Sequence, residues 1–193
     1  MQFQKQHFEM ALSYNEYDRY AENLLTKISS DDSNSMQQYA NVNLNTIQQL
    51  RKSVHLTKCL LDALSKTEPL ILVILTEGYC GDSAQTLAVF EKMQELFPEK
   101  IEIKIILRDK NLVVADNYFE TRAIPTIIGL SKTTLEKKFS WGNRPEPAQK
   151  LMTNLKIKSA TPLEKSKALH KWYAQDDTQT LQREIAIFLT DEK

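Results

Sequence analysis

The chain has 193 residues, of which 41% are hydrophobic and 26% are charged, as in an ordinary globular protein. Its 25 lysines and arginines balance its 25 aspartates and glutamates, so net charge gives no reason to expect a nucleic acid or a membrane as partner. The N-terminal residues lack the apolar core of a signal peptide, and no apolar run approaches the roughly 18 residues that span a bilayer. We therefore expect a cytoplasmic protein.

The two cysteines, Cys59 and Cys80, are too few for a disulfide framework, which also suits a reducing compartment. The three histidines are scattered along the chain, at positions 7, 55 and 170. Neither residue type shows the spacing of metal ligands, so we expect no metal or other cofactor.

The N-terminal third has the pattern of helices. Ser13 and Glu16 form a capping box that starts the first one. A longer second helix is expected to start near Ser33 or Ser35, and its stripe has a period of about 3.5 residues. The stripe consists of Met36, Ala40, Asn43, Ile47, Leu50, Val54, Thr57 and Leu61. Its polar interruptions favour packing against the chain's own domain, and a homodimer through these N-terminal helices is the alternative.

The pattern changes after residue 69. A continuous apolar run at Leu70–Leu75 is typical of a strand covered on both faces. The segments that follow predict a helix, a strand, a short helix and a hairpin, at residues 82–97, 101–107, 111–119 and 126–139. The order β-α-β-α-β-β predicts an α/β fold with a central mixed sheet.

The last fifty residues return to helix. Pro145 can open one helix, and Thr161-Pro162-Leu163-Glu164 is a strong start for another. Trp172 and Tyr173 are expected to be core residues on that helix. We expect three segments, namely a helical extension at 1–66, an α/β domain at 67–158 and a C-terminal helical extension at 159–193.

Cys80 lies between the apolar strand and the next helix, within the segment Thr76–Ser83. A thiol there sits near free backbone N–H groups and the positive end of the helix dipole, which favour the reactive thiolate. Forty-five residues later, Pro125 stands at the start of a predicted strand.

These two segments resemble the thioredoxin family. Its active site is an aromatic residue followed by Cys-Gly-Pro-Cys at a strand-to-helix turn, and it faces a cis-proline. Tyr79-Cys80-Gly81 matches the first motif and Ile124-Pro125-Thr126 matches the second. The resemblance implies a thioredoxin-like fold, with a cis bond before Pro125 that keeps backbone groups free to pair with a bound peptide.

A narrower resemblance covers nearly the whole chain. A group of bacterial thioredoxin-like proteins carries a helical N-terminal extension and motifs like Thr76–Asp82, Trp141-Gly142-Asn143-Arg144-Pro145 and Lys171-Trp172-Tyr173. This resemblance names a family without naming a reaction.

The departures from the thioredoxin pattern restrict the chemistry. Ser83 stands at the place of the resolving cysteine, so a local disulfide cannot form. Asp82 replaces the family proline and puts a negative charge near the sulfur, and Ile74 replaces the family's buried carboxylate. An ordinary dithiol thioredoxin is therefore excluded.

Four other residues have two interpretations each. Trp141 and Arg144 either line the groove beside Cys80 and bind an anion, or serve as a core aromatic and as an ion-pair partner of Asp82 or Glu77. Cys59 is expected to be a small core residue, with a remote resolving thiol as the alternative. Glu77 is expected to be a solvated charge, with a buried acid as the alternative.

Two functional hypotheses follow. In the first, the chain is a monothiol oxidoreductase whose Cys80 attacks a protein disulfide or carries glutathione, with Ser83 steadying the thiolate and Asp82 beside it. In the second, it is a redox-inactive binding module that uses the groove between Cys80, Pro125 and Trp141. The first predicts an exposed sulfur of low pKa, and the second an inert thiol.

Overall fold

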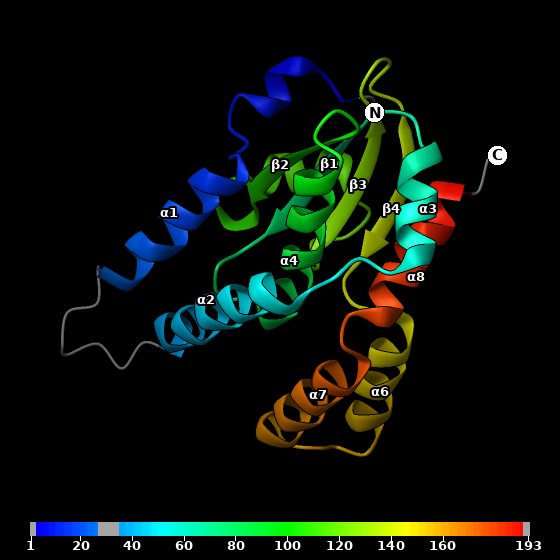
Figure 1. The fold of residues 1–193 in the computed structure, drawn as a ribbon. Helices are drawn as coiled ribbons and strands as arrows, with labels where there is room; N and C mark the ends of the chain where they lie inside the picture. The colour runs from blue at the N-terminus through cyan, green and yellow to red at the C-terminus, as the bar shows by residue number, and fades with distance from the viewer. Residues whose placement is uncertain (1–2, 27–34, 191–193) are drawn as a thin grey trace.

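The computed structural model describes residues 3–26 and 35–190 (Figure 1). Its sheet has the strand order β2-β1-β3-β4, with β1 parallel to β2 and antiparallel to β3, and β3 antiparallel to β4. The strands are β1 Leu70–Thr76, β2 Ile101–Leu107, β3 Thr126–Ser131 and β4 Lys137–Gly142. This is the mixed sheet expected from the sequence.

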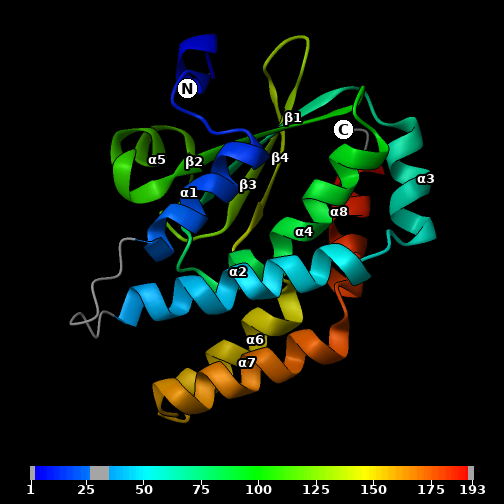
Figure 2. The ribbon, with the colours of Figure 1, turned by 60° about the vertical axis from the view of Figure 1, so that its left-hand side comes forward.

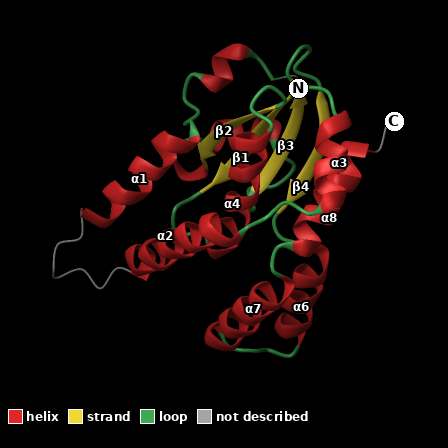
Figure 3. Ribbon diagram, viewed as in Figure 1, coloured by secondary structure: helices red, strands yellow, loops and turns green. Residues whose placement is uncertain are grey.

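Every residue of β1 is buried, because helices cover both faces of the sheet (Figure 3). Leu70, Leu72 and Ile74 face a core shared with α4 (Gly81–Leu96), while Ile71, Val73 and Leu75 face a second core beneath α5 (Leu112–Tyr118). This alternation explains the continuous apolar run, since a strand buried on both sides needs apolar residues at every position. A 3-10 turn, η2 (Arg108–Lys110), joins β2 to α5.

The N-terminal extension contains more helices than the sequence predicted. After the 3-10 turn η1 (Lys5–Phe8) and α1 (Tyr14–Thr26), the expected single long helix is two, α2 (Ser35–Ser53) and α3 (Lys58–Lys66). The prediction of one helix through Leu61 is therefore wrong. The reason lies at Thr57, whose side chain accepts a hydrogen bond from the Leu60 N–H and caps a new helix.

The α2 stripe packs against α4 of the same chain, as expected. Ala40, Asn43 and Ile47 are buried in this contact. A homodimer through the N-terminal helices would therefore need another face of α2. The expected helix start at Ser33 lies outside the described residues.

The C-terminal third forms a helical hairpin followed by a last helix (Figure 2). The hairpin consists of α6 (Glu146–Ile157) and α7 (Pro162–Asp176), and α7 begins with the predicted Thr161–Glu164 capping box. The last helix, α8 (Gln179–Thr190), packs on α3. None of the helices in the described ranges is long and apolar enough to cross a membrane.

Gln182 joins α8 to the segment between α2 and α3. Its side chain is fully buried, accepts a hydrogen bond from the Thr57 N–H at 2.6 Å and donates to the His55 carbonyl at 3.1 Å. These two hydrogen bonds join residues that are separated by 125 and 127 positions in the chain.

Gln182→Ala should lower the free energy of unfolding by about 1–3 kcal/mol, because the part-buried Thr57 N–H and His55 carbonyl lose their hydrogen-bond partner. Urea denaturation followed by circular dichroism measures the change. Gln175→Ala, at an exposed position on α7, is the matched control and should have little effect. Equal stability of the two variants would contradict the structural role of Gln182.

Candidate functional site

Cys80 is the residue that caps α4, and it lies directly after the loop that leaves β1. Its half-buried thiol donates a hydrogen bond to the Ile124 carbonyl oxygen, with a sulfur–oxygen distance of 3.4 Å. The Ile124–Pro125 peptide bond is cis, as the resemblance implied. The structure thus brings together the two motifs that lie forty-four residues apart in the chain.

The protonation of Cys80 differs from the expectation. Burial raises the pKa of the Cys80 thiol above its ordinary value, and the Asp82 charge adds to the rise. Hydrogen bonds from the Ser83 hydroxyl and from the Ser83 and Asp82 N–H groups lower this pKa without reversing its direction. A half-buried sulfur with a raised pKa agrees with the inert thiol of the second hypothesis rather than with the exposed, low-pKa sulfur of the first, because desolvation outweighs the helix N-terminus.

Asp82 is buried beneath Cys80 with only 8% of its surface exposed. The Arg144 guanidinium binds the carboxylate through Nε, 3.1 Å from Oδ1, and through Nη2 on Oδ2. The Tyr173 hydroxyl donates to Oδ1 at 2.7 Å. Arg144 lies in the segment just before α6 and Tyr173 belongs to α7, so two of the groups that surround the site come from the C-terminal third of the chain.

Ser83 is held by hydroxyl groups from the interior. Its Oγ accepts a hydrogen bond from the Thr76 Oγ1 at 2.7 Å, and Thr76 in turn is hydrogen-bonded to the buried Tyr17 hydroxyl. With its acceptor side used by Thr76, the Ser83 hydroxyl can direct its own proton to the Cys80 sulfur. Ser83 therefore supports a thiol or thiolate but offers no second sulfur.

Tyr79 is engaged with the chain itself rather than open toward a ligand. Its hydroxyl donates to Asp109 Oδ2 at 2.6 Å and accepts from Arg108 Nη2 at the same distance. The residue as a whole is half-buried.

Gly81 begins α4, and the loop before it is fastened by Asn43. The Asn43 Nδ2 donates to the Gly78 carbonyl at 3.1 Å, from a buried position on α2. In the sequence, Asn43 stands out only as an interruption of an apolar stripe. That interruption was the signal, since a buried amide requires a polar partner.

Trp141 is mostly buried in the core. It is 5% exposed, its indole N–H donates to Glu184 Oε2 at 2.7 Å, and its ring meets Phe90 edge-on. Arg144 pairs with Asp82, which is the ion-pair interpretation. Both residues also line a hollow of about 400 Å³, but neither Cys80 nor Pro125 lines it, so it is not the expected groove beside Cys80.

Gly142 lets the end of β4 approach the cis-proline closely. Its φ of +153° suits glycine, and a Cβ at this position would lie 2.6 Å from the Pro125 carbonyl oxygen. The chain turns here, two residues before Arg144, so Gly142 helps to place the guanidinium on Asp82.

Glu77 is buried, at 3% exposure, so the expectation of a solvated charge is wrong. Its Oε1 accepts a hydrogen bond from the Asp109 N–H at 2.7 Å. Burial raises the pKa of Glu77, and the Asp109 charge adds to the rise, against the hydrogen bond and the charges of Arg108 and Lys110. Its position in a loop gave no signal of burial, because η2 and α1 cover it only in the folded chain.

Cys59 is exposed on α3 and is a free thiol, so the expectation of a core residue is wrong. Its proposed role as a resolving partner of Cys80 stays a prediction. Among the described residues, no group of three or more His, Cys, Asp or Glu side chains is placed to hold a metal ion.

Comparisons with known proteins agree with this geometry. A family model described as thioredoxin matches residues 29–156, more than half of the chain, and the chain therefore belongs to the thioredoxin family. No curated protein sequence matches it.

Two solved structures share the fold. The crystal structure of an HIV epitope-scaffold gives a TM-score of 0.62 at 16% identity, over 97% of this chain and 98% of that one. A protein of unknown function from Pseudomonas aeruginosa gives a TM-score of 0.55 at 19% identity, over 92% of this chain and 97% of its own. At these identities the likeness concerns the fold alone.

Asp82→Asn should make Cys80 more acidic, because the variant removes the charge beside the sulfur and leaves Arg144 unpaired. We expect a lower pKa of the Cys80 thiol, measured by alkylation across a pH series, together with a loss of about 3–5 kcal/mol in unfolding free energy. Asp62→Asn, on the exposed face of α3, should change neither quantity. A rise in the Cys80 pKa in Asp82→Asn would contradict this account of the site.

Glu77→Gln should change the pH dependence of stability. Since the folded chain binds the Glu77 proton more tightly than the unfolded chain, wild-type stability falls as pH rises from the ordinary glutamate pKa of about 4.3 through the raised one. The glutamine variant cannot ionise, so it should gain stability relative to wild type across this window in urea titrations. Glu99→Gln, at an exposed position, serves as the control. If the difference in unfolding free energy between Glu77→Gln and wild type were the same at every pH, the burial effect would be refuted.

Proposed function

We propose that the chain is a thioredoxin-fold peptide-binding module in which Cys80 is kept as a neutral thiol. The observation that carries this proposal is the hydrogen bond from the Cys80 thiol to the Ile124 carbonyl. A sulfur that donates a proton is not the nucleophilic thiolate that disulfide exchange requires.

Ile124 supplies the group that a peptide would use. Its backbone N–H lies just before the cis-proline, and within the described part of the chain it has no hydrogen-bond acceptor. The residue itself is only half-buried. An extended peptide can pair with such a free N–H as an added strand does, while Cys80 contributes a small, weakly polar surface beside it.

The residues around Cys80 also support a role without redox turnover. Ser83 cannot resolve a mixed disulfide, and Asp82 opposes ionisation of the sulfur. Both effects act at neutral pH, where the raised pKa of Cys80 leaves mostly thiol.

A monothiol oxidoreductase is the second candidate, because three hydrogen-bond donors are available to a thiolate at Cys80. They are the Ser83 hydroxyl and the backbone N–H groups of Asp82 and Ser83. In that reaction the Cys80 thiolate would attack the glutathione sulfur of a protein–glutathione mixed disulfide, forming a Cys80–glutathione disulfide and releasing the protein thiolate. A reduced glutathione would then attack this disulfide, regenerating the Cys80 thiolate and releasing glutathione disulfide.

The rate of Cys80 alkylation against pH separates the two candidates. In a Cys59→Ser variant, with Cys59→Ser/Cys80→Ser as the blank, the binding module predicts a thiol pKa above the free-cysteine value of about 8.5 and little reaction with glutathione disulfide at neutral pH. A lower pKa with ready glutathionylation would establish the monothiol enzyme instead.

Peptide binding is tested directly by selection from a displayed random-peptide library. Selected peptides should shift the Ile124 amide signal in nuclear magnetic resonance spectra of both wild type and Cys80→Ala. Binding that disappears in Cys80→Ala, or peptides that leave the Ile124 amide unmoved, would contradict the proposed module.

A further inference from the structure

The α6–α7 hairpin projects away from the sheet, and its connecting turn is the far end of the molecule in two views (Figures 1 and 2). The turn joins Ile157 at the end of α6 to Pro162 at the start of α7. Only the base of the hairpin reaches the site, through Tyr173 and the nearby Arg144. Its tip is free to meet a large flat partner.

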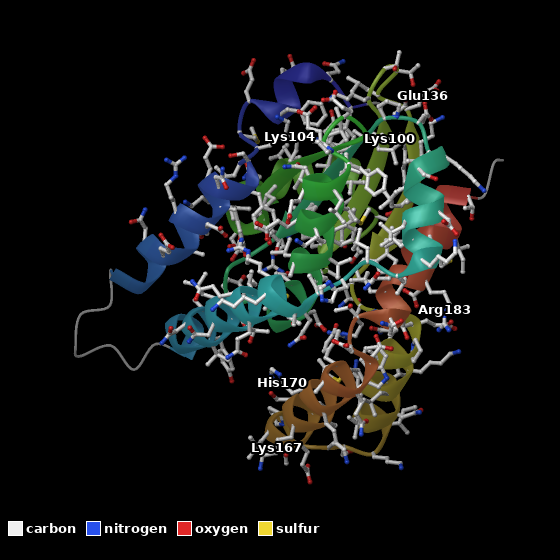
Figure 4. The ribbon with its side chains drawn as sticks, in the orientation of Figure 1. Lys100, Lys104, Glu136, Lys167, His170 and Arg183 are labelled. Atoms are coloured by element: carbon white, nitrogen blue, oxygen red, sulfur yellow. The ribbon has the colours of Figure 1, made fainter. Side chains whose placement is uncertain are left out.

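This hairpin is strongly basic although the whole chain is neutral. The hairpin, residues 146–176, contains six lysines, no arginine and three acidic residues. Glu146 and Asp176 lie at its base, and Glu164 near the tip is used in the capping box. Lys150 pairs with Glu146, whereas no residue in the described ranges forms an ion pair with the other five lysines. These are Lys156, Lys158, Lys165, Lys167 and Lys171, and Figure 4 shows Lys167 and His170 on α7.

Two large aliphatic side chains stand among these lysines at the tip. Ile157 is 76% exposed and Leu163 is 63% exposed, one on each side of the turn. Lys156 and Lys158 flank Ile157 directly in the chain. Exposed aliphatic side chains within a basic surface fit the boundary between headgroups and acyl chains of an anionic bilayer.

The same surface lacks the features of a nucleic-acid site. Its positive charge comes from lysine alone, whereas bidentate phosphate recognition favours arginine. Its aromatic residues, Trp172 and Tyr173, pack on each other edge-on with Tyr173 buried, so neither ring offers a stacking platform at the tip.

We propose that the tip of the α6–α7 hairpin docks the protein on anionic lipid surfaces. Lysine charges attract the headgroups, and Ile157 and Leu163 insert at the interface. The sequence predicted no membrane partner because the net charge is zero. That zero arises because the positive charge of the hairpin is cancelled by an acidic remainder of the chain. The docking does not depend on the state of Cys80.

Vesicle flotation with the full chain tests the proposal. We expect binding to phosphatidylcholine vesicles in which phosphatidylglycerol replaces about a third of the lipid, no binding to pure phosphatidylcholine, and release by salt. Lys156→Glu/Lys158→Glu should weaken binding about tenfold or more. Ile157→Ser/Leu163→Ser should also weaken it. Lys52→Glu/Lys66→Glu, at exposed lysines outside the hairpin, is the matched control and should bind as wild type does.

Circular dichroism confirms that each variant is folded before its binding is compared. Failure of the wild-type protein to float with anionic vesicles would overturn the proposal. So would equal loss of binding in the control. Binding of duplex DNA that depends on the same lysines, without vesicle binding, would assign the surface to nucleic acid instead.

Discussion

The ion pair between Asp82 and Arg144 is the interaction on which the site depends. Asp82 lies in the first turn of α4, Arg144 follows β4, and Tyr173 of α7 completes the set of donors on the carboxylate. A buried charge of this kind is tolerated only when its partners are fixed, so the position of the C-terminal hairpin is coupled to the turn that carries Cys80. The C-terminal hairpin is therefore part of the site.

The buried Asp82 carboxylate also affects the protonation of Cys80. Burial and the Asp82 charge both favour the thiol, and the Ile124 carbonyl accepts a hydrogen bond from it. From the other side, Asn43 of α2 holds the loop through the Gly78 carbonyl. Helices from both ends of the chain thus converge on one thiol.

Much of the fold could be predicted because its signals are local. The apolar run of β1, the alternation in β2 and the Thr161–Glu164 capping box each identify an element from adjacent residues. The predictions that failed concern burial. Glu77 is buried although exposure was expected, and Cys59 is exposed although burial was expected. Exposure could not be predicted because it depends on which distant segment packs over a residue. The break between α2 and α3 was hidden by an apolar stripe that continues across it.

The sequence by itself determined that no local disulfide can form, since Ser83 replaces the second thiol whatever the fold. It also determined the thioredoxin family, through two short motifs in register. Only the tertiary structure decided the protonation of Cys80, because a pKa depends on desolvation and on nearby charges. One of those charges, Asp82, is itself fixed by residues 62 and 91 positions further along the chain. Contacts at such separations exist only once the chain has folded.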